Sequence, residues 1–560
     1  MINTIDKQII KQIIKQNITT PDAISALKRK FGKKHLKTPT NIILLKEYNS
    51  MIKSGALKLS PKRQEEIKNL LRVRKVRSQS GVAVVAVLTK DFGCPGHCLY
   101  CPTEKGMPKS YLSNEPAVMR AIASDFDPYR QVQTRIEGLE ASGHPTDKVE
   151  LIIIGGTFGS IPDKYRYEFI KRCFEACNGK VESGKWKVES GIKKSSLKTE
   201  QRKNEKAKHR LVGITIETRP DYISEKEILK LRELGVTRVE LGVQNIYDDV
   251  LKINKRGHNI SQTIEATRLL KDAGFKINYH MMPNLPGSSI YRDKKMFREL
   301  FSNENFQPDI LKIYPTVVVK NSELYQWWKR GKYKPCSDKQ LLDLLIDIKK
   351  SIPPYVRIMR LIRDIPAQSI IAGSKISNLR QVLEQNSRQS VLIAGKTSPP
   401  NSCEAGWHCR CIRCREIKDK TFAPKNLKLK RIDYPASGGK EIFLSFDDTV
   451  QDKLFALLRL RLPSEFFTHK KHFIPALQNA AIIREVHTYG QLVPIAKKSK
   501  KSAQHIGLGK QLIAEAERIA RDESRELGIK KIAVISGAGV RNYYRKLGYR
   551  QKDEYMVKDL

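Results

Sequence analysis

Residues 94–102 read Cys-Pro-Gly-His-Cys-Leu-Tyr-Cys-Pro, and this stretch predicts the fold of the largest part of the chain. Its three thiols, those of Cys94, Cys98 and Cys101, follow the spacing C-x3-C-x2-C. Cys thiolates are the usual protein ligands of iron–sulfur clusters, and three of them can hold three irons of a [4Fe–4S] cubane. The spacing therefore predicts a cluster whose fourth iron is open. A zinc knuckle is the alternative, but no second Cys/His pair stands nearby at zinc-finger spacing.

The open iron suits a bidentate ligand that carries an amino group and a carboxylate. The methionine end of S-adenosylmethionine is such a ligand, so we expect this cofactor at the cluster. Tyr100, an aromatic residue directly before the third Cys, also resembles the pattern of radical-SAM proteins.

The composition indicates a multidomain protein with a polyanionic partner. A chain of 560 residues is long enough for about three or four units. Lys and Arg number 104 against 59 Asp and Glu, a formal net charge of +45. Such a field attracts nucleic acid, although an anionic membrane surface or a general lysine bias would give the same balance.

The cysteines and the hydropathy favour a reducing, cytoplasmic location. Seven of the ten cysteines stand in or beside two tight clusters, which is typical of metal ligation rather than of disulfides. Cys173 and Cys177 stand apart and are expected to be ordinary helix residues. No run of about 18 apolar residues is present, so we expect no membrane segment.

Residues 1–75 are expected to be a basic helical region that binds nucleic acid. Thr20-Pro21 and Ser60-Pro61 have the form of an N-cap followed by proline in the first helical turn. The region carries 18 Lys and Arg against five Asp and Glu. A run of charge is more often a solvated face, yet here it adjoins the predicted catalytic domain.

Short apolar runs alternate with helical segments over residues 76–365. Six β-then-α units in series predict an α/β fold in which a parallel sheet curves into a partial (β/α)6 barrel. In such folds the ligands lie at the carboxyl ends of the strands, and residues 94–102 follow the first strand as this rule requires. The predicted strands are 82–88, 149–154, 211–216, 238–243, 276–281 and 310–314.

Two turns after predicted strands are candidates for cofactor binding. Gly155 and Gly156 follow the second strand and resemble the radical-SAM element that binds the amino group of the cofactor. Glu217 and Arg219 follow the third strand and could bind a ribose or a carboxylate, or simply stabilise the loop.

Three polar residues near the ends of the fifth and sixth strands are candidate catalytic residues. His280 lies near the end of the fifth strand, and Lys312 and Tyr314 share a face of the sixth through their i,i+2 spacing. A lone strand histidine is more often a satisfied core residue. Three such residues near adjacent strand ends favour a reaction cavity.

Residues 183–210 carry ten Lys and Arg, three Glu and few apolar residues. This composition predicts a solvated, mobile insertion that contributes no core element and no chemistry.

Residues 366–435 are expected to form a connector with a zinc site. Cys409, Cys411 and Cys414 lie within six residues, and a fourth donor would complete a closed tetrahedral site. A second iron–sulfur cluster is the alternative. The fourth ligand stays open among Cys403, His408 and Cys336.

Residues 436–560 carry a pattern that resembles the GNAT acetyltransferases. Residues 504–510 read Gln-His-Ile-Gly-Leu-Gly-Lys and open an amphipathic helix, whose N-terminus suits a pyrophosphate. Strands are expected at 483–489 and 532–536, followed by a helix that contains Tyr543 and Tyr544. The pattern predicts an acetyl-CoA site.

The order of these parts resembles one family, the catalytic subunit of Elongator and its single-chain prokaryotic relatives. The likeness covers essentially the whole chain and is most specific at residues 217–221, 280–286, 411–416, 532–549 and 555–558. It implies formation of 5-carboxymethyluridine at the wobble position of tRNA. A 5′-deoxyadenosyl radical would take hydrogen from the acetyl methyl of acetyl-CoA, the carbon radical would add to C5 of uridine, and hydrolysis would release CoA.

The same resemblance implies a set of acetyl-CoA-binding positions, with Tyr543 near the sulfur and one member, Lys148, outside the last domain. The positions are Lys148, Glu485, Val486, His487, Thr488, Leu508, Gly509, Lys510 and Tyr543. An electron donor for the cluster is also implied, and a homodimer is possible. Two other functions stay open: a protein lysine acetyltransferase, and a non-catalytic tRNA-binding scaffold. Two complete cofactor motifs in one chain argue against both.

Overall fold

The computed structural model describes residues 2–35, 38–73, 80–179, 194–385, 408–417, 426–468, 470–490 and 507–560. No helix within these ranges has the length and apolar content needed to cross a bilayer.

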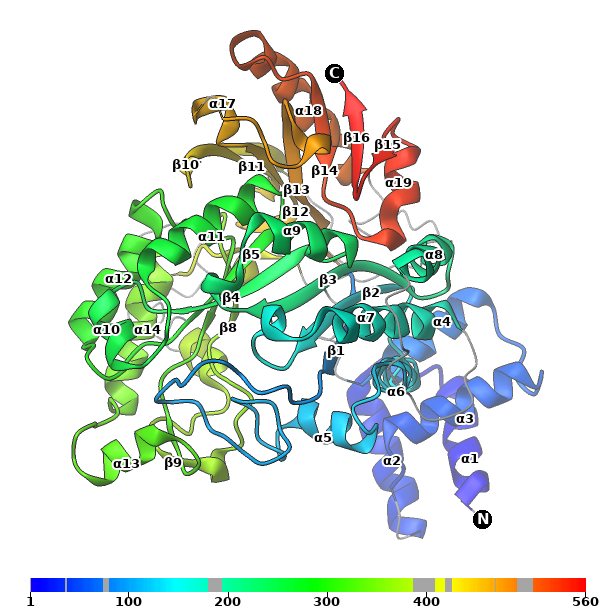
Figure 1. Cartoon of the computed structure of the whole chain (residues 1–560). Coiled ribbons are helices and arrows are strands. Elements are labelled where there is room, and N and C mark those ends of the chain that lie inside the picture. The colour runs from blue at the N-terminus through cyan, green and yellow to red at the C-terminus, as the bar shows by residue number, and fades with distance from the viewer. Residues whose placement is uncertain are drawn as a thin grey trace.

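Within residues 2–35 and 38–73 the chain is helical, as predicted, and its four helices share a core of their own. Both N-caps are present: the Thr20 hydroxyl accepts from the amide of Ala23, and that of Ser60 from the amide of Arg63. Figure 1 shows these helices to one side of the molecule, beside α6. They are α1 (Ile2–Lys15), α2 (Pro21–His35), α3 (Asn41–Lys53) and α4 (Pro61–Leu71).

A seven-stranded parallel sheet in the order β1-β2-β3-β4-β5-β6-β8 forms the curved wall of the predicted partial barrel. All six predicted strands are confirmed. A seventh, β8, was missed because its sequence, Arg-Ile-Met-Arg, has charged residues at both ends. The strands are β1 (Ala83–Leu88), β2 (Lys148–Ile154), β3 (Arg210–Thr218), β4 (Arg238–Gln244), β5 (Lys276–Met281), β6 (Ile310–Ile313) and β8 (Arg357–Arg360).

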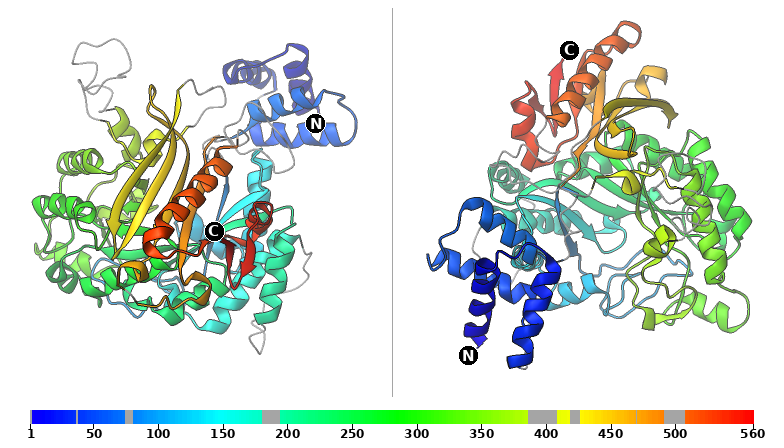
Figure 2. Two further views of the ribbon diagram at one scale, coloured as in Figure 1. Left: turned by 90° about the horizontal axis from the view of Figure 1, so that it is seen from above. Right: turned by 180° about the vertical axis from the view of Figure 1, so that it is seen from behind.

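Helices surround the outside of this sheet (Figures 1 and 2). Buried apolar side chains of α6, α7 and α11 pack on the strands, and Cys173 and Cys177 are fully buried on α7. The helices are α5 (Pro116–Ala123), α6 (Pro128–Ala141), α7 (Asp163–Asn178), α9 (Glu225–Glu233), α10 (Asp248–Ile253), α11 (Ile260–Asp272), α12 (Ile290–Ser302), α13 (Glu323–Lys329) and α14 (Asp338–Ser351). A separate two-stranded antiparallel sheet pairs β7 (Val318–Val319) with β9 (Ile370–Ala372).

The prediction for the lysine-rich insertion is wrong over residues 194–204. This segment forms α8 (Lys194–Asn204), which packs on α7 and buries Leu197 and Asn204. The Asn204 side chain donates to the carbonyl of His209, 3.1 Å away, and accepts from the amide of Leu211. The polar composition predicted no buried face for this segment, because the face that α8 buries is held by hydrogen bonds as well as by apolar contacts. Residues 183–193 lie outside the described ranges.

The C-terminal part forms a second seven-stranded sheet in the order β10-β11-β12-β13-β14-β16-β15. Its first strand lies within the range expected for the connector. Helix α18 (Leu508–Leu527) packs on β12 and β13. The strands are β10 (Leu427–Ala436), β11 (Gly439–Asp448), β12 (Lys453–Leu462), β13 (Ala480–Thr488), β14 (Lys531–Val534), β15 (Arg550–Lys552) and β16 (Tyr555–Asp559), with short helices α16 (Ile412–Arg415), α17 (Glu465–Thr468) and α19 (Arg541–Arg545).

Strands β13 and β14 separate in the middle of the second sheet. Their parallel pairing runs from Ala480 beside Lys531 to Ile483 beside Val534. Strand β13 then continues to Thr488, paired on its other side with β12. The edge of β13 that faces β14 is therefore open beyond Ile483, so an extended ligand can pair with it.

A buried ion network joins the two sheets at the amino ends of the barrel strands. Arg484 on β13 donates to Asp309 at 3.0 Å and to Glu441 at 2.8 Å. Asp309 directly precedes β6 and also accepts from the amide of Ile277 on β5. All three charged side chains are at most 1% exposed. Loss of one partner from such a pair typically costs about 3–5 kcal/mol, so the network fixes the two sheets relative to each other.

Candidate active site

A cavity of about 780 Å³ lies inside the curved sheet, and its walls come from both domains. The three cysteines of residues 94–102 line it at the carboxyl ends of the strands. Side chains at the amino ends, among them Glu150, Arg238 and Lys276, line it together with Glu485 and His487 of β13. The cavity therefore runs along the barrel from the cysteine loop to the second domain.

The predicted cluster ligands share a positively charged setting. Arg256 donates to the Sγ of Cys98 at 3.1 Å, and the Sγ of Cys94 lies 3.6 Å from the Thr157 hydroxyl. The hydrogen bond with Cys101, supported by Arg256, lowers the pKa of Cys98 to about 4. Thiolate is the form that binds iron. Three thiols on one loop inside a cavity, beside cations that favour thiolate, fit the predicted cluster.

The glycine and arginine residues predicted to bind cofactor lie around this loop. Gly155 and Gly156 have φ of 136° and 95°, a conformation that favours glycine, and a Cβ at Gly155 would overlap the Thr89 hydroxyl. Arg219 is held by two hydrogen bonds to Asp221, of 2.9 and 2.8 Å. Its guanidinium lies so close to the loop that a Cβ at Gly96 would stand 2.6 Å from it.

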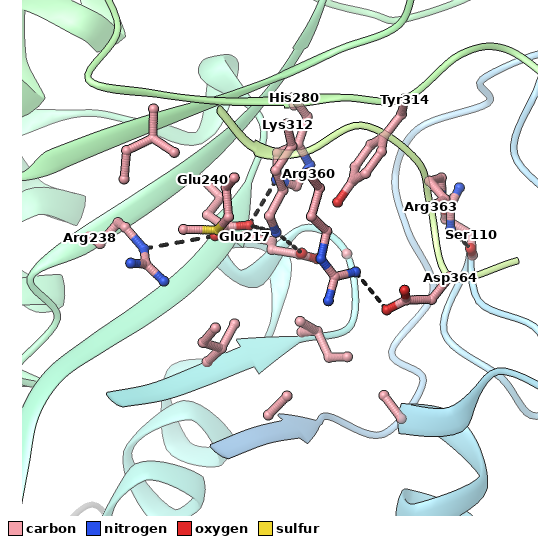
Figure 3. A pocket seen from close by; sticks show the side chains of 18 of the residues that line it. Ser110, Glu217, Arg238, Glu240, His280, Lys312, Tyr314, Arg360, Arg363 and Asp364 are labelled. Carbon is pink, nitrogen blue, oxygen red and sulfur yellow. Dashed lines mark hydrogen bonds and ion pairs between the residues drawn. The ribbon is translucent and has the colours of Figure 1, made fainter. Parts of the chain in front are cut away.

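Charged side chains meet at the centre of the cavity, around Glu240 (Figure 3). The Nε2 of His280 lies 2.8 Å from Glu240, and Lys312 forms an ion pair with the same carboxylate. Lys312 is also 3.8 Å from Glu217. Burial would raise the pKa of Glu240, but Lys312 and His280 hold it well below its usual value. Three residues predicted from the sequence, His280, Lys312 and Glu217, thus lie together around Glu240. Glu240 itself was not predicted as a site residue.

Two tyrosines complete the centre. The ring of Tyr314 contacts that of His280 edge to face, with 5.3 Å between centroids. Tyr111 donates to Glu217 at 2.6 Å. Burial raises the pKa of both phenols, which therefore stay protonated; Tyr111 donates its proton to Glu217, and Tyr314 can donate into the cavity.

The residues expected to bind acetyl-CoA fall into two groups because side chains alternate along β13. Val486 and Thr488 face the start of α18, where a Cβ at Gly509 would lie 3.6 Å from the Thr488 hydroxyl and 3.5 Å from that of Tyr543. Glu485 and His487 point the other way, into the cavity. The absence of a side chain at Gly509 and the open edge of β13 fit the extended arm of acetyl-CoA that carries the thioester.

Three of the residues expected to bind acetyl-CoA remain to be placed: Leu508, Lys510 and Lys148. Leu508 and Lys510 are in the first turn of α18, whose N-cap, Gly507, has a φ of 82°. Residues 504–506 lie outside the described ranges. Lys148 opens β2 beside Arg210 and belongs to neither group; burial lowers its pKa.

Replacement of Gly509 by Ala tests the acetyl-CoA site. The new methyl group would occupy the space between Thr488 and Tyr543 without a clash, so we expect weaker binding of acetyl-CoA, with the Kd raised about tenfold or more. Stability should not fall, because Ala is favoured over Gly within helices by about 1 kcal/mol. Gly138→Ala is the matched control, since Gly138 lies in α6 with open space around its Cα. Calorimetric titration measures the Kd of acetyl-CoA for both variants. An unchanged Kd for Gly509→Ala would contradict the assignment.

The second group of thiols forms a compact cluster. The sulfur atoms of Cys409, Cys411 and Cys414 all lie within 4.8 Å of one another, which suits a single metal ion. Among the candidate fourth ligands, His408 is half exposed and lies 3.9 Å from Asp452. Cys336 packs against the main core. Neither belongs to the group of three thiols in the described residues, and Cys403 lies outside those residues.

The comparisons with protein families define the class. The model of the radical SAM superfamily matches residues 92–297, and that of the Radical_SAM C-terminal domain matches residues 308–389. The curved sheet, with its cysteine loop inside the cavity, is therefore a radical-SAM domain.

Full-length relatives give the family. The tRNA uridine(34) acetyltransferase of Methanocaldococcus infernus is 46% identical, with 88% of each chain covered. The Elongator complex protein 3 of Homo sapiens is 40% identical over 88% of this chain and 86% of its own. A solved structure of archaeal Methanocaldococcus infernus Elp3, lacking residues 1–46, superposes with a TM-score of 0.69 at 43% identity, covering 86% of this chain and all of that one. This chain belongs to the Elongator complex protein 3 family.

Proposed function

We propose that this protein modifies the wobble uridine of tRNA and forms 5-carboxymethyluridine from acetyl-CoA. The observation that carries the proposal is one cavity lined both by the cysteine loop and by Glu485 and His487 of β13, two of the residues expected to bind acetyl-CoA. The names of the relatives, which are tRNA uridine(34) acetyltransferases, support the substrate.

Cys94, Cys98 and Cys101 would hold the [4Fe–4S] cluster, with Gly155, Gly156 and Arg219 beside it for S-adenosylmethionine. When bound, these cofactors supply a carbon radical able to abstract hydrogen from a methyl group.

The central charged residues would orient the base. Uracil presents two carbonyl oxygens, and the ammonium group of Lys312 can donate to such an acceptor, while Glu240 holds Lys312 and the Nε2–H of His280 in position. Glu217 lies next to them and could accept from the N3–H of the ring. The donor of Lys312 and the acceptor of Glu217 therefore match one carbonyl oxygen and the N3–H of a uracil.

Further parts of the proposal concern the remaining partners. The basic helices α1–α4 would bind the tRNA backbone, and the compact thiol group would hold zinc. An electron donor would reduce the cluster.

The test uses anaerobically reconstituted full-length protein with S-adenosylmethionine, a reductant, tRNA and acetyl-CoA deuterated in its methyl group. We expect deuterium in the 5′-deoxyadenosine and a dideuterated carboxymethyl group on uridine, both detected by mass spectrometry. Deuterated 5′-deoxyadenosine without labelled uridine would contradict the nucleoside substrate. Acetylation of a lysine peptide without any 5′-deoxyadenosine would favour a lysine acetyltransferase instead.

A further inference from the structure

His487 lies where the second domain meets the amino ends of the barrel strands. Its Nε2 is 2.8 Å from the backbone carbonyl of Ser80, and its ring packs at 4.3 Å from that of Tyr489. A carbonyl oxygen only accepts, so Nε2 carries the proton in this contact. In the neutral ring, Nδ1 is then the nitrogen with a lone pair.

The split between β13 and β14 leads a ligand toward this nitrogen. Val486 and Thr488 face Gly509 and Tyr543, whereas His487 lies on the opposite face of β13, in the cavity. The open edge of β13 lies between these two faces, so an acyl-CoA arm paired with that edge could reach the cavity with its thioester. His487 is the histidine that such a thioester would meet on the cavity side of β13.

The other titratable groups at this end of the cavity are poor bases. Although burial alone would raise it, Lys276 and Arg459 lower the pKa of Glu485 to about 2. Glu150 is ion-paired with Arg238, which lowers its pKa against the effect of burial, and Tyr489 stays protonated because burial raises its pKa.

The charges that face His487 come from four strands. Glu485 on its own strand and Glu150 on β2 favour the protonated ring, whereas Arg357 on β8 and Lys276 on β5 oppose it. Burial is the largest influence and lowers the pKa of His487, so the imidazole is neutral at physiological pH.

We propose that His487 is the general base that hydrolyses the thioester joining CoA to the modified uridine. This inference rests on the proposed function. The Nδ1 of His487 takes a proton from water as the water oxygen bonds to the thioester carbon. The carbon–sulfur bond then breaks, and the imidazolium returns the proton to the leaving thiolate, which gives CoA and the carboxymethyl group. No electrons are gained or lost, and water is the only co-reactant.

His487→Gln tests this role, since Gln can keep the hydrogen bond to Ser80 through its Nε2 but offers no basic nitrogen. General base catalysis contributes about 10²–10⁴-fold, so hydrolysis should slow by this factor. A CoA thioester on uridine should accumulate and be trapped as a hydroxamate by hydroxylamine, and its amount is expressed per 5′-deoxyadenosine formed, so that weaker binding of acetyl-CoA does not imitate slower hydrolysis. The matched control is His144→Gln, because the Nε2 of His144 lies 2.9 Å from the carbonyl of Val73, outside the cavity.

The readout is the ratio of carboxymethyluridine to trapped hydroxamate in single turnovers at several pH values. Wild-type hydrolysis should stay fast as the pH falls through 6.5, the ordinary histidine value, because the pKa of His487 is lowered. An unchanged ratio in His487→Gln would overturn the proposal. So would loss of 5′-deoxyadenosine in that variant, since it would place His487 in an earlier step. If wild-type protein makes no uridine adduct at all, the proposed function itself fails.

Discussion

Cys98→Ala is expected to abolish 5′-deoxyadenosine formation and carboxymethylation together. Cys98 has a lowered pKa, and Arg256 donates to its sulfur. Changes to residues that merely support a metal ligand cost about 10–100-fold, so loss of the ligand should cost at least ~100-fold. The iron and sulfide content and the electron paramagnetic resonance signal of the reduced cluster should fall in parallel.

The matched control for this variant is Cys173→Ala. Cys173 is a fully buried cysteine on α7, away from the cavity. The Cys173→Ala protein should retain the cluster and the activity, with only a modest loss of stability. Undiminished 5′-deoxyadenosine production by Cys98→Ala would exclude the loop as the cluster site.

Glu240→Leu should be strongly destabilising as well as inactive. The substitution leaves Lys312 buried without its main counter-charge, and removal of one partner of a buried pair costs about 3–5 kcal/mol. The folded-state pKa of Glu240 is below its ordinary value of 4.5, so its stabilising effect is present above that pH and is lost as the pH falls further. Urea unfolding of wild type and variant should therefore differ most near neutral pH and converge in acid.

The double variant Glu240→Leu/Lys312→Met separates charge from packing. It removes both members of the ion pair, so much of the lost stability should return while the activity stays absent. If the double variant is no more stable than Glu240→Leu alone, the ion pair is not the reason for the loss.

Local patterns predicted much of this molecule because their causes are local. The thiol spacing lies within eight residues, and six strands are apolar runs of ordinary length. Strand β8 escaped because it is short, with Arg357 and Arg360 at its ends. Helix α8 escaped because its buried polar face is specified by distant partners: Glu205, just beyond it, pairs with Arg545 of the second domain.

Glu240 could not be recognised from its neighbours. It is one charged residue inside the apolar strand β4, and its partner Lys312 follows 72 residues later. Only the register of the sheet reveals the pair. Within β3, β4 and β5, Glu217 lies beside Glu240, and Glu240 beside Asn278, two residues before His280. A charge inside a parallel strand is nevertheless a usable signal, because such strands are normally apolar on both faces.

The arrangement of the cavity along the barrel has a consequence for the kinetics of the reaction. The second domain covers the amino ends of the strands, where the proposed acetyl-CoA site lies, and the cysteine loop lies at the carboxyl ends, where we expect a bulky macromolecule to approach. Neither substrate obstructs the path of the other. We therefore expect a random order of addition, with initial-rate plots whose lines intersect and with dead-end CoA analogues acting as noncompetitive inhibitors toward tRNA.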